Sequence, residues 1–183
     1  MKYQGICSIF LGLVTLFCGH AQAVDGIAID LGSGDESSDV IGASVRWNWE
    51  KKWFTDGEWY VGGYWEAGIG HWDGKSGEHS NDNITHVGVT PVFRLQRHQP
   101  LSNGTIPFFE GAIGFHVMSD DKIGDKDLGT NFAFGDHVAA GIQFGGQRQY
   151  ELSARLRHFS NCGLDDSNPG MNFGEVRFGY LFR

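Results

Sequence analysis

Hydrophobic and polar residues alternate with a period of two along most of the chain beyond residue 25. This alternation is the pattern of β-strands whose two faces meet different surroundings. It occurs in eight segments, which are separated by stretches rich in Gly, Asp, Asn and Ser. The predicted strands cover residues 26–31, 40–49, 59–70, 84–97, 106–118, 134–145, 150–160 and 172–182. Most exceed the roughly 5–6 residues of soluble strands and suit the roughly 9–11 residues of a tilted membrane-spanning strand.

Each predicted strand has one apolar face and one face that carries charged or small residues. Within residues 84–97, for example, Val87 and Phe93 share the apolar face and Arg94 lies on the other. In an outer-membrane barrel the apolar faces point to lipid and the charged faces line the lumen, whereas a secreted sandwich or lipocalin-like barrel buries its apolar faces. The charged faces carry both signs: Asp30, Arg46, Glu66, Arg94, Glu110, Arg155, Arg157, Glu175 and Arg177.

Three features favour the membrane barrel over the secreted alternative. The charged faces are rich in glycine, as a narrow and crowded lumen requires. Opposite charges can pair inside such a lumen, where we expect Glu175 to meet Arg155 or Arg177. Tryptophans near strand ends suit an interfacial girdle: Trp47, Trp49, Trp53, Trp59 and Trp72. The expected fold class is therefore all-β, an eight-stranded antiparallel transmembrane β-barrel.

The composition agrees with this class and excludes others. The chain has 28 glycines among 183 residues, about twice the average share, which argues against a helical bundle because Gly destabilises helix interiors. A hydrophobic share of 40% with six tryptophans excludes a disordered chain. The net charge of −8 at pH 7 argues against nucleic acid as a partner, because nucleic-acid-binding proteins present basic surfaces.

The first residues have the features of a secretory signal peptide. Lys2 supplies the positive end, and the apolar run at 6–17 is too short to cross a bilayer as a helix. Ala21-Gln22-Ala23 fits the small-residue cleavage site of such peptides. We therefore expect residues 1–23 to be a signal peptide and residues 24–183 to form a barrel domain in the bacterial outer membrane.

The strand predicted over residues 150–160 carries a histidine and a serine on its lipid face. His158 and Ser160 are neighbours on that face because they are two positions apart. A serine hydroxyl becomes a nucleophile when a base takes its proton, and histidine is such a base at neutral pH. Two residues with lipid-facing parity could orient the imidazole. Folding the hairpins places Asn172 about opposite Ser160, and Asp136 about opposite His158.

The segment around this pair resembles a known enzyme family. The run from His158 through Ser160 to Gly163, followed by Asn168-Pro169-Gly170, resembles the H-x-S-N-x-G signature of the outer-membrane lipid A 3-O-deacylases, the PagL family. The stretch from Phe132 to Asp136 is similar to that family's F-x-F-x-D segment. The resemblance covers the mature chain in length and strand number and is specific over its C-terminal part.

The resemblance implies hydrolysis of the ester-linked acyl chain at position 3 of lipid A, at a lipid-exposed site at the outer leaflet. It implies that His158 is the general base and Ser160 the nucleophile. The family's reference member carries Glu where this chain has Asn172. Either Asn172 orients the histidine weakly, or Asp136 supplies the charge, or the enzyme is slow.

The resemblance also assigns supporting roles around the pair. Backbone N–H groups in the turn that begins with Asn161 and includes Gly163 would stabilise the tetrahedral oxyanion. Asn168 would brace that loop, and Phe134 would contact an acyl chain. No cofactor and no metal are implied, and the sequence has no Walker loop, Rossmann fingerprint, CxxC or HExxH motif.

The expected partners are lipid A, or the lipopolysaccharide that contains it, as substrate and outer-membrane lipid as surroundings. The oligomeric state stays open between a monomer and a homodimer. Two other functions suit the same architecture. One is a non-catalytic barrel, an adhesin or a structural protein, in which His158 and Ser160 are merely interfacial. The other is a different lipid A-modifying enzyme that transfers an acyl chain.

Overall fold

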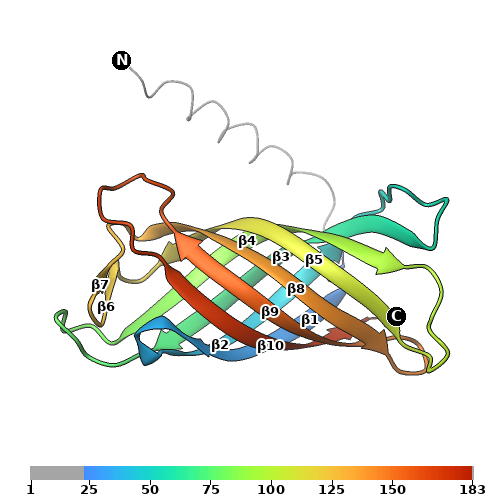
Figure 1. Cartoon of the computed structure of the whole chain (residues 1–183), viewed down its shortest axis with the longest axis horizontal. Helices are drawn as coiled ribbons and strands as arrows, with labels where there is room; N and C mark the ends of the chain where they lie inside the picture. Colours follow the sequence, from blue (N-terminus) through green and yellow to red (C-terminus); the bar gives the residue numbers. More distant parts are fainter. Residues whose placement is uncertain (1–22, 183) are drawn as a thin grey trace, which may run out of the picture.

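The computed structural model describes residues 23–182, which form a closed barrel of eight antiparallel strands (Figure 1). The order around the barrel is β1-β10-β9-β8-β5-β4-β3-β2, so β1 closes the barrel against β10. The barrel strands are β1 (Gly26–Gly34), β2 (Asp39–Asn48), β3 (Trp59–Asp73), β4 (Asn83–Arg97), β5 (Ile106–Met118), β8 (Phe132–Phe144), β9 (Tyr150–Ser160) and β10 (Met171–Leu181). The expected signal peptide lies, apart from its last residue, outside the described residues.

All eight predicted strands are present, with ends that differ by a few residues. The structure adds three short elements that the alternation did not predict. They are the 3-10 turn η2 (Asp35–Ser37) and the hairpin of β6 (Lys122–Ile123) and β7 (Lys126–Asp127). Strands of two residues are too short to show a period, so pattern alone could not find them. No helix within residues 23–182 is long and apolar enough to cross a membrane.

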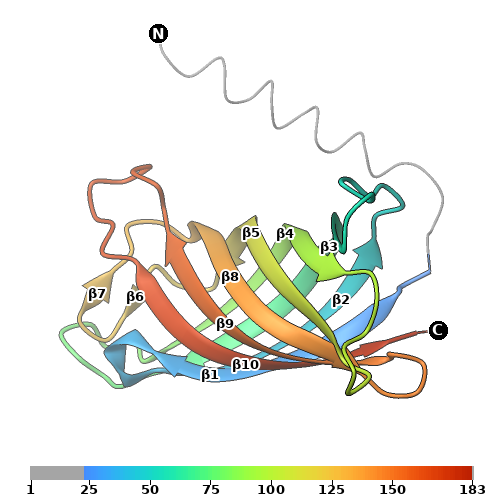
Figure 2. The same cartoon turned by 45° about the vertical axis from the view of Figure 1, so that its right-hand side comes forward.

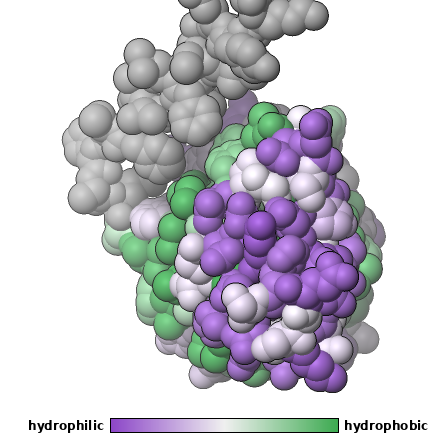
Figure 3. Space-filling view, turned by 90° about the vertical axis from the view of Figure 1, so that its left-hand side faces the viewer, coloured by the Kyte–Doolittle hydropathy of each residue, from purple (hydrophilic) through white to green (hydrophobic). Residues whose placement is uncertain are grey.

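The two ends of the barrel differ in their connections. The end that we call the loop end carries η2, the β6–β7 hairpin and the connections 73–83 and 160–171, while the opposite turn end carries the connections 48–59, 97–106 and 144–150. Figure 2 shows the β9–β10 connection standing beside the β6–β7 hairpin. Figure 3 faces the loop end, which is mostly hydrophilic and flanked by hydrophobic residues of the barrel wall.

The barrel has an apolar exterior and a charged interior. On the outside, Phe93 and Leu156 are 53% and 68% exposed. On the inside, Arg94 and Arg155 are 6% and 1% exposed. Charged side chains inside and large hydrophobic side chains outside are the arrangement of a barrel whose solvent is lipid. The membrane barrel predicted from the sequence is thus confirmed, and the secreted sandwich is excluded.

Ion pairs between strands fill the lumen. Glu151 of β9 accepts a hydrogen bond of 2.7 Å from Arg46 of β2, and it also accepts one from Arg94 of β4. Arg177 of β10 donates through Nε to Asp30 of β1 at 2.7 Å. Because a buried charge that loses its partner is strongly destabilising, these pairs hold together strands that lie on different sides of the lumen.

The prediction that Glu175 pairs with Arg155 or Arg177 was wrong. Glu175 faces Arg157, with the guanidinium Nε 3.6 Å from the carboxylate. Arg155 is its cross-strand neighbour in register, but the Arg155 guanidinium instead lies 3.6 Å from Glu66 and 3.5 Å from Glu110. The long arginine side chain thus reaches carboxylates on strands that are not adjacent to it.

Apolar side chains close the lumen at the loop end. The ring of Trp72, which is fully buried, lies 4.8 Å from that of Phe159 and 4.9 Å from that of Phe173. Ile123 of the β6–β7 hairpin belongs to the same buried cluster. The placement of Trp72 in an interfacial girdle is therefore wrong. Trp72 shares the parity of Glu66 on β3 and so points into the lumen.

Candidate active site

His158 and Ser160 lie at the loop end of β9, on its outer face. Phe159 between them points into the lumen, is 1% exposed and packs against Trp72. Burial of this large ring fixes the parity of β9, because a one-residue slip would exchange the two faces of the strand. His158 and Ser160 are both partly exposed, so the buried Phe159 presents them together on the lipid side of the barrel.

The His158 ring is held by a neighbour on β10. Its Nδ1 lies 2.8 Å from Oδ1 of Asn172, and the two residues are direct register partners. The sequence placed Asn172 about opposite Ser160, which is wrong by two positions. The partner of Ser160 in the observed register is Phe134 on β8. The hairpin of β9 and β10 therefore brings Asn172 to the histidine itself.

Hydrogen bonding around Asn172 determines which nitrogen of His158 carries the proton. Nδ2 of Asn172 lies 2.9 Å from Oδ2 of Asp35. A carboxylate only accepts, so the Asn172 amide must turn its NH₂ group to Asp35 and its oxygen to His158. Because that oxygen also only accepts, His158 donates from Nδ1–H. In the neutral imidazole Nε2 is then the unprotonated nitrogen, which can accept a proton as a general base does.

Asp136 stands on the other side of the histidine. It is the register partner of His158 on β8, as the sequence predicted. Within the described residues, however, the His158 side chain is hydrogen-bonded to Asn172 and not to Asp136. Ser160 likewise makes no hydrogen bond to His158 among these residues. Such bonds are often long in enzymes without substrate and shorten when substrate binds.

The turn after Ser160 is anchored by two asparagines. Asn161 is 2% exposed, and its Nδ2 donates to the carbonyl of Leu128 at 2.9 Å and to that of Ser167 at 2.7 Å. Oδ1 of Asn168 accepts the Asn161 backbone N–H at 2.9 Å. Asn161 therefore ties the turn to the β6–β7 hairpin, and Asn168 closes the loop back on its own start.

These contacts change which donors the turn can offer to an oxyanion. The Asn161 N–H is bonded to Asn168, and the Gly163 N–H is bonded to Oδ1 of Asn161 at 2.8 Å. Two of the turn's amides, those of Asn161 and Gly163, therefore donate within the turn in this structure, and the Cys162 amide of the same turn does not. Among the described residues of this turn, the donors without a hydrogen-bond partner include the backbone N–H of Cys162 and the Nδ2 group of Asn168.

Three further residues surround the histidine and were missed from the sequence as site residues. Asp35 comes from η2, between β1 and β2. Nζ of Lys126 in β7 lies 2.7 Å from Asp35 Oδ2 and 2.8 Å from the carbonyl oxygen of Gly170. Gly170 is buried against the imidazole. They come from three different connections at the loop end, and no spacing in the sequence signals that they meet.

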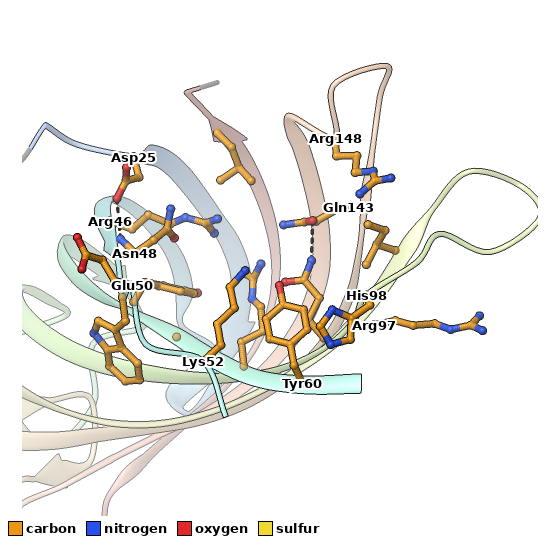
Figure 4. Close-up of a pocket in the computed structure, with 18 of the residues that line it drawn as sticks. Asp25, Arg46, Asn48, Glu50, Lys52, Tyr60, Arg97, His98, Gln143 and Arg148 are labelled. Carbon is orange, nitrogen blue, oxygen red and sulfur yellow. Dashed lines mark hydrogen bonds between the residues drawn. The ribbon is translucent and has the colours of Figure 1, made fainter. Parts of the chain in front are cut away.

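A cavity lies at the opposite end of the barrel. It has a volume of about 580 Å³ and opens at the turn end, where its lining includes Arg46, Tyr60 and Arg148 (Figure 4). Beside Ser160 there is only a small void of about 10 Å³, lined also by Asn161 and Asn168. A molecule in contact with both His158 and Ser160 would lie along the outer wall of the barrel, where both side chains are partly exposed. No group of three or more side chains placed to hold a metal ion occurs within residues 23–182.

Comparison with known proteins finds close similarity to one group. A family profile described as lipid A 3-O-deacylase (PagL) matches residues 39–181. The chain is 28% identical over 167 residues to lipid A deacylase PagL of Pseudomonas aeruginosa, covering 90% of each chain. It is 29% identical over 179 residues to lipid A deacylase PagL of Bordetella bronchiseptica, covering 93% of this chain and 94% of that one. The crystal structure of the outer membrane enzyme PagL superimposes with a TM-score of 0.76 at 25% identity, covering 86% of this chain and 99% of that chain.

Proposed function

The chain belongs to the lipid A 3-O-deacylase (PagL) family, and from this premise we propose that Ser160 and His158 carry out its reaction. The chain is a lipid A deacylase, an ester hydrolase of the outer membrane. In the proposed reaction it removes the 3-hydroxyacyl chain that is ester-linked at position 3 of lipid A.

The proposed mechanism passes through an acyl-enzyme. His158 Nε2 takes the proton of the Ser160 hydroxyl while Oγ attacks the ester carbonyl carbon. The tetrahedral intermediate collapses, and the sugar hydroxyl leaves with the proton from His158. A water molecule, activated by the same nitrogen, then attacks the acyl-serine and releases the hydroxy fatty acid. The enzyme returns to its starting state, and neither a metal nor a cofactor is needed to balance the steps.

The observation that carries this proposal is the hydrogen bond of 2.8 Å between His158 Nδ1 and Asn172 Oδ1. It holds the tautomer in which Nε2 accepts a proton, and His158 lies on the same lipid-facing side of β9 as Ser160. We propose that the loop end faces the cell exterior, so that this surface lies at the outer leaflet. Acyl chains of the substrate would then reach Ser160 sideways, without leaving the membrane.

Supporting residues receive roles from their positions. Phe134 pairs in register with Ser160 and shares its outer face, where its ring would contact the acyl chain. Asn161 holds the turn through its buried side chain. We assign oxyanion stabilisation to the Cys162 N–H and to the Nδ2 group of Asn168, because these donors are unused in the described structure. Removal of one such donor typically costs about 10²–10³ in kcat.

The test is the mass of lipid A from cells that express the protein, with Ser160→Ala beside wild type. Wild type should remove one 3-hydroxyacyl chain, and Ser160→Ala should leave lipid A intact while keeping the heat-modifiable gel mobility of a folded barrel. Deacylation by folded Ser160→Ala would refute the nucleophile assignment. A gain of one chain would indicate an acyltransferase, and an unchanged mass with folded wild type would indicate a non-catalytic barrel.

Two further parts of the proposal concern processing and assembly. We propose that residues 1–23 are an export signal removed before insertion, which the N-terminal sequence of the membrane form tests.

The residues assigned to the site all come from one chain, so a monomer suffices for catalysis. A homodimer is the alternative, and the molecular mass of the detergent-solubilised barrel distinguishes the two.

A further inference from the structure

We propose that Asp35 is a positioning residue of the deacylase, acting on His158 through the side chain of Asn172. This inference rests on the proposed roles of His158 and Ser160. It answers a difficulty raised by the sequence, because Asn172 stands where the family's reference member has a carboxylate. A neutral amide can orient an imidazole, but it stabilises the imidazolium less than a carboxylate does.

A continuous line of hydrogen bonds joins the carboxylate to the histidine. Oδ2 of Asp35 accepts from Nδ2 of Asn172 at 2.9 Å, and Oδ1 of Asn172 accepts from Nδ1–H of His158 at 2.8 Å. The same Asp35 oxygen also accepts the Asn172 backbone N–H at 3.1 Å. Two bonds from one carboxylate thus fix both the backbone and the amide of Asn172. The carboxylate orients and polarises the Asn172 amide, so that the negative end of the amide dipole points at the His158 ring.

Closure of the barrel brings Asp35 to this place. Gly34 at the end of β1 is the register partner of Phe173 on β10. A Cβ on Gly34 would lie 2.1 Å from the Asn172 carbonyl oxygen, so only glycine allows the two strands to approach this closely. The next residue, Asp35, therefore emerges directly beside Asn172, although 137 positions separate them in the sequence.

Charged groups from two other elements, β7 and β8, lie around Asp35 and His158. Lys126 of β7 lies 2.7 Å from Asp35 and also donates to the Gly170 carbonyl at 2.8 Å. Asp136 of β8 is the cross-strand partner of His158. Partial burial raises the pKa of the Asp35 carboxyl, but hydrogen bonds from Lys126 and Asn172 outweigh it and bring the pKa below its ordinary value. Asp35 is therefore ionised at neutral pH, as its role requires.

The first experiment measures deacylation by purified Asp35→Asn in detergent. Asparagine keeps an oxygen acceptor for Asn172 and removes the charge. We expect kcat to fall about tenfold or more with KM unchanged, since hydrogen bonds to charged groups are stronger than those to neutral groups. The control is Asp39→Asn, which removes an equal charge from an exposed side chain at the start of β2.

A second variant separates this role from a merely structural one. Asn172→Glu places a carboxylate directly on His158, so Asp35→Asn in that background should cost little or no activity. An equal loss in both backgrounds would show that Asp35 only holds the loop, and full activity of Asp35→Asn would show that it does nothing; either result overturns the inference. Failure of the proposed function is recognised separately, because Ser160→Ala would then remain active whatever Asp35 does.

Discussion

Substitution of Gly170 tests whether catalysis depends on the position of the His158 ring. Its φ is +67°, a left-handed conformation that favours glycine, and it packs directly against the imidazole. A Cβ at this position would lie 2.6 Å from Cε1 of His158 and 3.1 Å from the carbonyl oxygen of Phe159. Carbon atoms in contact prefer separations of about 3.5–4.0 Å, so Gly170→Ala forces the ring to move by about 1 Å.

The consequence for catalysis follows from the hydrogen bond that the ring makes. A displacement of about 1 Å takes the Nδ1···Oδ1 contact with Asn172, now 2.8 Å, beyond the range of hydrogen bonds, which ends near 3.2 Å. A misplacement of this size typically costs about 10²-fold in rate. We therefore expect Gly170→Ala to lower kcat about a hundredfold. The added backbone strain should destabilise the barrel by about 1–2 kcal/mol.

The matched control is Gly104→Ala. Gly104 also has a left-handed φ of +81°, but a Cβ there meets nothing within 4 Å, and the residue lies in the 97–106 turn at the other end of the barrel. It should lose similar stability in urea unfolding and keep full kcat in the detergent deacylation assay. Wild-type kcat in folded Gly170→Ala would refute the requirement for the His158–Asn172 bond. An equal loss of kcat in both variants would assign the effect to backbone strain.

Two other outcomes are expected from the lumen and the loop end. Glu151→Ala leaves the guanidinium groups of Arg46 and Arg94 buried with one carboxylate fewer, and should lower the free energy of unfolding by about 3–5 kcal/mol, measured by urea titration of gel mobility. Burial raises the pKa of the Asp35 carboxyl, but hydrogen bonds from Lys126 and Asn172 outweigh this effect and lower that pKa in the folded protein. Ionised Asp35 therefore stabilises the loop end above its unfolded pKa of 3.8. This stabilisation is lost as the pH falls through the lower pKa of the folded state. Hydrogen exchange of the backbone amides of residues 34–39, relative to the rate for an unfolded chain, should therefore rise in wild type between about pH 5 and pH 2 and stay constant in Asp35→Asn. A wild-type rate without this rise would contradict the assignment.

The strands and their faces could be predicted from local pattern. The period of two is a property of each segment alone, so the alternation of Val87, Phe93 and Arg94 identified a strand and its two surfaces before any contact was known. Parity also placed His158 and Ser160 on the lipid side. The placement of Trp72 was wrong because it was based on residue type and not on parity. Trp72 has the same parity as Glu66 on β3, and this parity places its side chain in the lumen.

Register across a hairpin was less predictable. Asp136 was correctly placed opposite His158, because the connection between β8 and β9 is short and leaves little freedom. Asn172 was misplaced by two residues, because the long connection at 160–171 does not fix the turning point and a shift of one residue in that point moves every pairing by two. A loop of that length does not define the pairing of the strands that it joins.

The sequence was sufficient for the barrel, its inside-out polarity and the histidine–serine pair, because these depend on side chains a few positions apart on one strand. It was not sufficient for the surroundings of the histidine. Asp35, Lys126 and Asn172 meet because β1 closes against β10 and the β6–β7 hairpin packs over the loop end. Closure of the barrel pairs its first and last strands, whose residues are far apart in the sequence. The alternation within each strand does not depend on this pairing, so contacts between β1 and β10 leave no periodic signal in the sequence. The carboxylate that the site lacks at position 172 is supplied there by a residue from the first connection of the barrel.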